Sequence, residues 1–126
     1  MGAFVISKRF NGQFKFVFTS RKGKVIFTSR GYDVKEECEQ DINIVRNIIS
    51  EKCFTKLKTA GSKYYFKIII DDRLMAISRK YTTELRVVKG ITEIISYAAK
   101  SETLDFSEDQ FVFPDEESDA GEFPHN

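Results

Sequence analysis

The sequence predicts an α+β fold in which a β-β-β-α unit occurs twice in tandem, and two observations carry this prediction. An alternating strand pattern between Asn11 and Phe18 returns between Ser62 and Ile70. An amphipathic stretch with helical spacing follows each set of strands. A unit of about 50 residues buries little surface alone. We therefore expect the two units to join edge to edge in one antiparallel sheet with two helices packed on it, as an intramolecular pseudo-dimer.

The first unit contains three predicted strands. Phe4 and Ile6 mark a short first strand. The second strand carries aromatic residues at every other position, so they share one face: Phe14, Phe16 and Phe18. A polar turn over Arg21-Lys22-Gly23 follows, in which Gly23 can supply the positive φ of a short hairpin. The third strand, residues 25–32, ends in the sequence Ser-Arg-x-Tyr.

The second unit repeats this order. Phe54 and Leu57 mark its short first strand, and an alternating strand follows over residues 64–70. Asp71-Asp72 forms the turn that corresponds to the glycine-containing turn of the first unit. The next strand, residues 74–81, aligns with residues 25–32 and also ends in Ser-Arg-x-Tyr. This shared order favours a duplication over chance.

A helix is expected after each set of strands. Asp33 with Glu36 three residues later forms a capping-box pattern at the start of the first helix. Thr82 or Thr83 is the expected N-cap of the second helix. Apolar residues at helical spacing form one stripe on each helix. The first stripe is Val34, Cys38, Ile42, Val45 and Ile49. The second stripe is Leu85, Val88, Ile91, Ile95 and Ala98.

The chain resembles the YegP family of small bacterial proteins, and three phrases carry the resemblance: NGQFKFVF, GKVIFTSRGY and INIVRN. The matching positions in the first unit are Asn11, Gly12, Phe14, Phe16, Gly23, Val25, Ile26, Ser29, Tyr32, Ile42, Val45, Arg46 and Asn47. The second unit keeps four matching residues: Tyr64, Phe66, Ser78 and Tyr81. It lacks the equivalents of Gly12 and Gly23, and the resemblance covers residue 2 to about residue 106.

This resemblance implies a unit of three strands, a helix and a final strand. Two such units share one antiparallel sheet and exchange their last strands, so a strand is expected over residues 103–106. Members with two units imitate within one chain the dimer of single-unit members, which implies a monomer with internal twofold pseudo-symmetry. The resemblance implies no established biochemical activity.

The charges divide the chain into a basic body and an acidic tail. All 20 Lys and Arg residues lie in residues 1–100, whereas residues 101–126 hold nine of the 19 acids. The body therefore carries a net charge of +10 and the tail a net charge of −9. We expect a YegP-like domain over residues 1–106, with repeats at about 2–50 and 52–106. An acidic, disordered tail is expected over residues 107–126.

The residues that could support catalysis or metal binding are poorly placed for it. The single histidine, His125, lies near the C-terminus in the acidic segment. Cys38 falls on an apolar helix stripe, and together with Cys53 it has no metal-ligand spacing. Asp71-Asp72 fits a hairpin turn better than a catalytic carboxylate pair. We therefore expect no enzymatic activity, no cofactor and no bound metal.

Basic residues at the strand ends form a candidate surface for a nucleic acid, another polyanion or a protein partner, because such charge attracts a phosphate backbone. The candidate contacts are Arg21, Lys22, Lys24, Arg30, Tyr65, Arg79 and Lys80. Tyr65 is included because it points away from Tyr64 and Phe66. It is expected to be exposed, on an outer sheet face shared with Lys15 and Lys67. The alternative is a solvated basic face with no ligand.

The sequence therefore predicts a non-enzymatic binding or interaction domain whose basic face is masked by its acidic tail. The alternative is a structural or stress-related accessory protein with no ligand of its own. No apolar run approaches the roughly 18–20 residues that span a bilayer. The apolar stretch Ala3–Ile6 is too short for a signal peptide. A cytoplasmic location and no membrane partner are expected.

Overall fold

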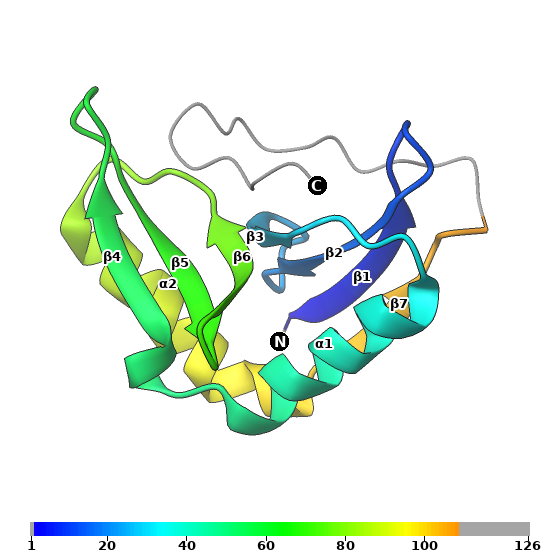
Figure 1. Cartoon of the computed structure of the whole chain (residues 1–126). Coiled ribbons are helices and arrows are strands. Elements are labelled where there is room, and N and C mark those ends of the chain that lie inside the picture. Colours follow the sequence, from blue (N-terminus) through cyan, green and yellow to red (C-terminus); the bar gives the residue numbers. More distant parts are fainter. Residues whose placement is uncertain (1, 109–126) are drawn as a thin grey trace.

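Alternating apolar residues build one seven-stranded sheet, and two helices cover one of its faces (Figure 1). The computed structural model describes residues 2–108 of the chain. The strands are β1 (Ala3–Lys8), β2 (Phe14–Thr19), β3 (Val25–Ser29), β4 (Phe54–Lys58), β5 (Tyr64–Ile70), β6 (Arg73–Ser78) and β7 (Glu102–Asp105). The helices are α1 (Lys35–Ile48) and α2 (Glu84–Tyr97), with short 3₁₀ turns η1 (Glu51–Cys53) and η2 (Ala98–Lys100).

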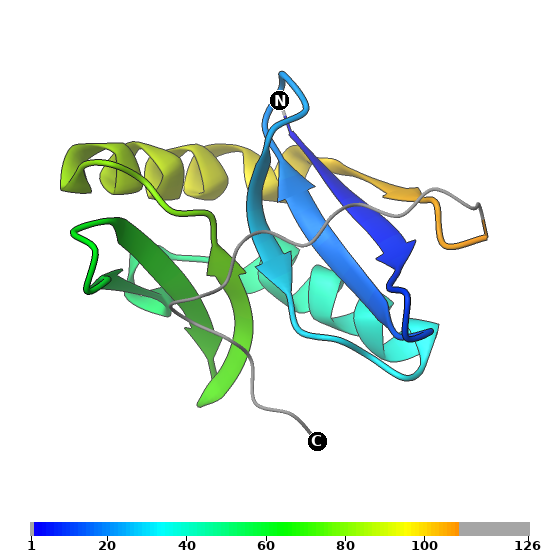
Figure 2. The same ribbon diagram turned by 90° about the horizontal axis from the view of Figure 1, so that it is seen from above.

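The strand order in the sheet is β4-β5-β6-β3-β2-β1-β7. The first half of the molecule (β1, β2, β3 and α1) meets the second half (β4, β5, β6 and α2) at the β3–β6 ladder. Figure 2 shows the two helices lying on either side of this junction when the molecule is seen from above. The predicted α+β class, the single sheet and its two helices are confirmed.

The prediction of a purely antiparallel sheet is wrong for the last strand. β7 pairs in parallel with β1, with Ala3 opposite Glu102 and Ile6 opposite Asp105. The chain leaves α2 at the end of the sheet where β1 begins, so β7 enters beside β1 in the same direction. The sheet is therefore mixed, and a strand at about residues 103–106 is confirmed as β7.

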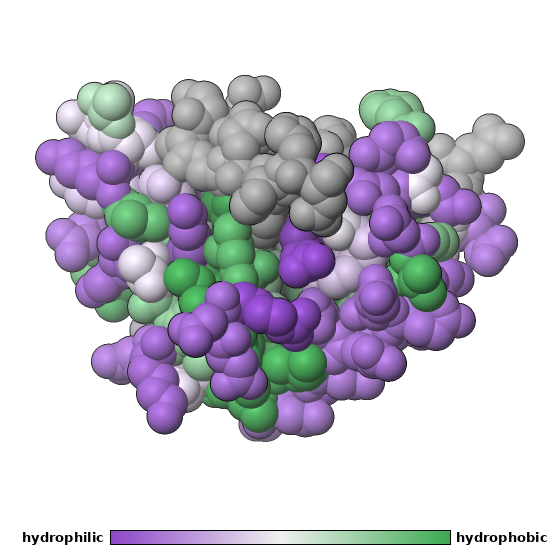
Figure 3. All heavy atoms as spheres, viewed as in Figure 1, coloured by the Kyte–Doolittle hydropathy of each residue, from purple (hydrophilic) through white to green (hydrophobic). Residues whose placement is uncertain are grey.

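The core lies between the sheet and the helices. Four phenylalanines of the first half are fully buried there: Phe4, Phe16, Phe18 and Phe27. The ring centroids of Phe4 and Phe18 are 5.0 Å apart in an edge-to-face arrangement, a geometry that aromatic pairs favour. The second half contributes mainly aliphatic residues, and the facing helix residues complete the cluster: Cys38, Ile42, Val45, Val87, Ile91 and Ile94. Figure 3 shows that one face of the molecule is largely polar, with an apolar strip near its middle.

Three polar residues replace glycine in the turns of the second half. In the first half, Gly12 and Gly23 have φ values of 89° and 85°. In the second half, Ser62, Asp71 and Asp72 adopt positive φ values of 65°, 53° and 64°. Asp71 and Asp72 link the paired residues at the ends of β5 and β6, so the predicted hairpin turn is confirmed. Aspartate tolerates this left-handed region better than most residues.

The helix starts were predicted with mixed success. Thr83 caps α2, and its side chain accepts a hydrogen bond from the backbone N–H of Arg86 at 3.2 Å. The capping box of α1 is wrong, because Val34 is the N-cap and makes no side-chain cap bond. The Asp33 carboxylate instead accepts a hydrogen bond from the Gln13 side chain at 3.1 Å.

The predicted apolar stripe of α2 is wrong in part. The helix buries Val87, Gly90, Ile91 and Ile94 against the sheet. Three of the predicted stripe residues are exposed instead: Leu85 (63%), Val88 (40%) and Ile95 (37%). Because α2 carries apolar residues on two adjacent stripes, helical periodicity could not identify the one that faces the core.

The exposed position predicted for Tyr65 is also wrong. Its side chain is 7% exposed, and Lys15 on the same face is fully buried, whereas Lys67 is half-buried. Strand alternation identifies the face to which a side chain points. It does not show whether the side chain is buried on that face.

The predicted cytoplasmic location and the predicted acidic tail are not tested by the fold. None of the helices in residues 2–108 is both long and apolar enough to cross a membrane. Most of the predicted acidic tail, from residue 109 onward, lies outside the described residues.

Candidate interaction surface

Arg30 and Arg79 stack on tyrosines at matching places in the two halves. The guanidinium carbon of Arg30 lies 5.5 Å from the ring centroid of Tyr32, and that of Arg79 lies 5.2 Å from the ring centroid of Tyr81. The two arginines nevertheless lie at opposite ends of the β3–β6 ladder. The backbone N–H of Arg79 donates to the carbonyl oxygen of Ile26, near the start of β3, whereas Arg30 follows the end of β3.

The other predicted basic contacts lie in the segments that flank the central strands. Arg21, Lys22 and Lys24 are exposed on the β2–β3 turn. Lys80 is half-buried in the segment after β6. The β2–β3 turn and Arg79 lie at the same end of the β3–β6 ladder, because the Arg79 N–H donates to the carbonyl oxygen of Ile26. The role of these basic residues in binding stays a prediction.

Cys38 is a poor nucleophile in this structure. The thiol is fully buried on the core side of α1. Burial, followed by the nearby carboxylates of Asp41 and Glu39, raises the pKa of Cys38 to about 12. A thiol with this pKa is almost entirely protonated at neutral pH. Within residues 2–108, no group of three or more His, Cys, Asp or Glu side chains could hold a metal ion.

A buried carboxylate joins the two halves. Asp41 on α1 is 4% exposed and accepts hydrogen bonds from the Tyr32 hydroxyl at 2.6 Å and from Arg73 Nη2 at 2.9 Å. Burial and the neighbouring Asp41 carboxylate raise the pKa of Tyr32, so the phenol stays protonated. The cluster fits a structural link between α1 and β6. Sequence reasoning missed it because its members are far apart in the chain.

The first half has a closed sheet edge. β7 covers the outer edge of β1, and the Phe106 N–H donates to the Ile6 carbonyl oxygen at 2.8 Å. Arg46 on α1 donates to the Ser101 carbonyl oxygen at 2.9 Å and to Thr103 Oγ1 at 2.6 Å. These contacts hold β7 between the edge of β1 and one flank of α1.

An ion pair anchors the other end of β7. Lys35 Nζ on α1 lies 3.0 Å from Asp105 Oδ2. Burial raises the pKa of Asp105, but hydrogen bonds from Ser107 and Lys35 outweigh it and lower the pKa below its ordinary value. The hydrogen bond to Asp105 also raises the pKa of Lys35. Both shifts favour the charged pair.

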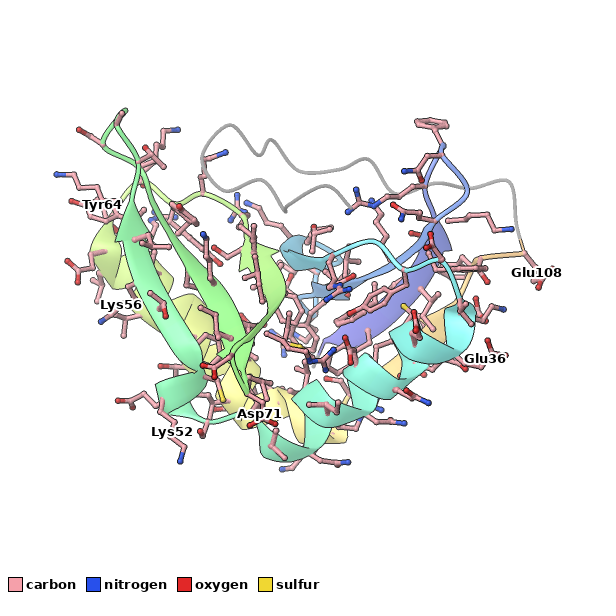
Figure 4. All side chains as sticks on the ribbon, in the orientation of Figure 1. Glu36, Lys52, Lys56, Tyr64, Asp71 and Glu108 are labelled. Carbon is pink, nitrogen blue, oxygen red and sulfur yellow. The ribbon has the colours of Figure 1, made fainter. Side chains whose placement is uncertain are left out.

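The second half has an open sheet edge. Within residues 2–108, β5 is the only strand paired with β4, and the sheet order ends at β4. Thr55 and Lys56 are exposed there, whereas the corresponding residues Val5 and Ile6 of β1 are buried. Figure 4 shows Lys56 and Tyr64 on this side of the molecule.

A shallow pocket of about 370 Å³ lies between β4 and the start of α2. Its lining consists of Lys56, Leu57, Lys58, Tyr64, Glu84 and Val87. Lys56 Nζ is 4.0 Å from Glu84 Oε2, which shows that the Glu84 flank of α2 faces β4. Val88 and Ile95 follow Glu84 along this flank at helical spacing. The open edge of β4 and the exposed apolar residues of α2 therefore form one candidate surface.

The sequence contained a signal for this surface that was not used. The two helices align position by position, because α1 begins at Lys35 and α2 at Glu84 and both have 14 residues. Charged residues of α1 therefore correspond to apolar residues of α2. The pairs are Glu36 with Leu85, Glu39 with Val88, and Arg46 with Ile95. Comparing the halves would have shown that α2 is apolar on a side where α1 is polar.

Comparisons with known proteins place the chain in one family. A family model described as a domain of unknown function (DUF1508) matches residues 11–51. The UPF0339 protein YegP of Escherichia coli K12 is 30% identical over 95 residues, which cover 74% of this chain and 86% of that protein.

Two solution NMR structures share the fold. That of yegP from E. coli, titled a protein of unknown function, has a TM-score of 0.78 at 28% identity and matches 84% of this chain and 93% of its own. That of the UPF0339 protein SO3888 from Shewanella oneidensis has a TM-score of 0.77 at 25% identity and matches 86% of this chain and 94% of its own. The predicted resemblance is confirmed, and this chain belongs to the YegP family (UPF0339).

Proposed function

We propose that this chain is a non-enzymatic interaction domain that binds a partner protein on the open side of its second half. The open side consists of the outer edge of β4 and the exposed apolar residues on the Glu84 flank of α2, Val88 and Ile95. One observation carries the proposal: β7 covers the edge of β1, and no strand in residues 2–108 covers the matching edge of β4.

The chemistry of the open side supports a protein ligand. Two large apolar side chains of α2, Val88 and Ile95, are exposed on the flank that faces the unpaired strand backbone. Adjacent exposed apolar groups of this kind mark interaction sites more often than scattered ones do. An unpaired strand edge also offers a row of backbone donors and acceptors.

We also infer that the two halves are tandem copies that imitate a dimer within one chain, in a domain over residues 1–106. The isolated bridges Phe14–Tyr32 and Tyr64–Tyr81 occupy matching places in the two halves. The serines of the two Ser-Arg-x-Tyr sequences act alike, since Ser29 Oγ accepts from the Phe16 N–H and Ser78 Oγ accepts from the Phe66 N–H, both at 2.9 Å. The shared seam lies at β3 and β6.

Affinity capture from a lysate of the source organism tests the proposed function. The bait is the full chain, and the test variant is Ile95→Arg, which places on α2 the residue that α1 has at Arg46. The matched control is Arg46→Ile, which alters the closed side instead. A partner that binds wild type and the control but not Ile95→Arg supports the proposal. Equal capture by all three proteins contradicts it, and capture of no protein favours an accessory role without a ligand.

A polyanion such as single-stranded nucleic acid is the second candidate ligand. The net charge of +10 on residues 1–100 favours it. The acidic residues of the tail would then compete with the polyanion for the basic body. A filter-binding assay at several salt concentrations separates this candidate from the first, because phosphate contacts weaken steeply with salt.

A further inference from the structure

We propose that the edge of β4 accepts an extended segment of a partner protein, apolar where it faces α2, as an added parallel strand, in the place that β7 takes on β1. This inference rests on the proposed function and adds the class of ligand and its orientation. The position of β7 supplies the geometry of the added strand, and the residues that differ between the two halves supply its chemistry.

β1 and β4 are equivalent strands in the same register. Phe4 pairs with Phe18 and Phe54 pairs with Ile68, and each partner lies 14 residues further along the chain. At the other end, Lys8 and Lys58 each place an ammonium group over an aromatic ring of the next strand, at 5.2 Å and 5.7 Å. The edge that β7 occupies on β1 is therefore present on β4.

Residue 56 presents its backbone to the open edge. On β1, the Ile6 carbonyl oxygen accepts a hydrogen bond from the N–H of Phe106, the residue that follows β7. The N–H and C=O groups of one residue point to the same side of a strand, and these sides alternate along it. Lys56 corresponds to Ile6, because they pair with Phe66 and Phe16 respectively. The backbone N–H and C=O of Lys56 therefore face outward.

The segment between α1 and β4 is too short to form a strand on this edge. α1 ends at Ile48 and β4 begins at Phe54, so five residues separate them. A strand parallel to β4 would need a crossover of about a dozen residues before β4. The segment instead forms the short turn η1. β7, which covers the edge of β1, follows α2 in the chain. Within residues 2–108, no strand follows α1 in the same way to cover the edge of β4.

The flank of α2 differs from that of α1 in a way that selects the ligand. On α1, Arg46 holds the hydroxyl of Thr103. Ile95 stands at the matching position on α2 and is 37% exposed. An apolar side chain in place of Thr103 would pack on Ile95, whereas a hydroxyl there would lose its donor. The added strand should therefore carry an apolar residue facing α2.

Charge does not select the residue two positions further along. Asp105 of β7 pairs with Lys35 on α1, and the matching residue of α2 is Glu84. Lys56, which corresponds to Ile6 opposite Asp105, lies 4.0 Å from Glu84. The ligand is thus an extended segment defined by the apolar residue that faces Ile95.

A synthetic peptide provides a direct test of strand addition. The probe is a fluorescein-labelled peptide with the sequence Ser-Glu-Val-Leu-Asp-Phe-Ser, which is residues 101–107 with valine in place of threonine. We expect saturable binding to the full chain by anisotropy, and slower hydrogen exchange of the Lys56 amide when the peptide is bound. A scrambled peptide should bind at least about tenfold more weakly.

Two variants separate strand addition from other contacts. Lys56→Pro removes an outward N–H that β5 does not use, so proline is compatible with this edge. It should weaken the peptide at least about tenfold, the cost of one backbone hydrogen bond, whereas the control Lys56→Gln should bind more tightly than Lys56→Pro. Ile95→Arg should reverse the preference in favour of the unmodified Ser-Glu-Thr-Leu-Asp-Phe-Ser peptide.

Several results would overturn this inference. One is the absence of saturable binding; another is equal binding by Lys56→Pro and Lys56→Gln, with both shown to be folded by circular dichroism. Protection of the Lys56 amide in the free chain that disappears on deletion of residues 109–126 would identify the chain's own tail as the occupant. Protection that grows with protein concentration would identify a second copy. A captured partner that is lost with Ile95→Arg but kept with Lys56→Pro would leave the proposed function standing and reject strand addition.

Discussion

Arg73 at the start of β6 donates a 2.9 Å hydrogen bond to the buried carboxylate of Asp41 on α1. The pair links the two halves of the molecule away from the β3–β6 ladder. This hydrogen bond also raises the pKa of Arg73. Because Asp41 is almost fully buried, it depends on Arg73 and on the Tyr32 hydroxyl for its hydrogen bonds.

Replacing Arg73 should destabilise the fold. In Arg73→Gln the charged donor is lost while the Asp41 carboxylate stays buried, which should cost about 1–3 kcal/mol of unfolding free energy. Urea unfolding followed by circular dichroism measures this change. The control is Lys24→Gln. Lys24 occupies the position next to β3 that Arg73 occupies at the start of β6, but it does not pair with Asp41. An equal and small effect of both variants would show that Asp41 does not need the guanidinium.

Acid should release β7 from the sheet edge. The pKa of Asp105 in the folded chain lies below its ordinary value of 3.8. Its charged form therefore stabilises the fold fully above pH 3.8, and this contribution is lost as the pH falls through the lowered pKa. The protection factors of the β7 amides against hydrogen exchange, measured by NMR relative to the intrinsic exchange rate at each pH, should fall over this range. In Asp105→Asn the amides should already exchange faster at neutral pH and should respond less to acid, and an unchanged response would refute the role of this carboxylate.

Much of the fold could be predicted because local patterns determine it. Alternating aromatic residues identified β2 and β5, and the Asp71-Asp72 turn and the Thr83 cap follow from short-range backbone chemistry. The parallel direction of β7 could not be derived from periodicity, because it depends on where α2 delivers the chain. The capping box of α1 failed because Asp33 bonds to Gln13 on a neighbouring turn.

The candidate surface was predictable only in part. The basic residues were chosen by charge, and charge alone does not fix which side chains come together in space. Tyr65 shows the same limit, because the direction of a side chain says little about its burial. The apolar residues of α2 were found in the sequence but assigned to the core. The comparison of Ile95 with Arg46 identifies the surface. Arg46 hydrogen-bonds to β7, whereas Ile95 at the matching position of α2 is exposed.

The Cys38 thiol should be inert in the folded protein. Burial and nearby carboxylates raise its pKa to about 12, so little thiolate forms at about pH 8, where a free cysteine reacts readily. The variant Cys53→Ser isolates Cys38 for titration with a thiol-specific disulfide reagent. We expect reaction only after denaturant is added. Reaction at the rate of a free thiol in the native protein would show that the core around Cys38 opens easily or that the thiol is activated.

Deleting residues 109–126 should strengthen binding to single-stranded DNA or RNA at low salt if the acidic tail masks a basic body. The deletion retains Ser107, because its N–H and hydroxyl hydrogen-bond to Asp105. Filter binding with the full and shortened chains measures the effect. Arg30→Gln combined with Arg79→Gln should weaken the shortened chain more than either change alone. Identical binding by both chains, or none by either, would refute competition by the tail.

Gly90 shows that a tyrosine packs against α2 differently from the way its counterpart packs against α1. In the first half, the Tyr32 hydroxyl donates a hydrogen bond to the Asp41 carboxylate. In the second half, Gly90 stands at the position of Asp41, and a Cβ added there would lie 2.7 Å from the Tyr81 hydroxyl oxygen. Tyr81 therefore approaches the α2 backbone at a distance that only glycine permits.

Gly90→Ala should therefore destabilise the protein, although alanine is favoured over glycine in a helix by about 1 kcal/mol. The clash with the Tyr81 hydroxyl should cost about 1–3 kcal/mol. Tyr81→Phe removes the clashing oxygen, so the double variant should be more stable than the sum of the two single effects predicts. Thermal unfolding of the four proteins measures this coupling. Strict additivity would mean that α2 shifts to accommodate the methyl group, and that the contact between Tyr81 and Gly90 does not fix the position of the helix.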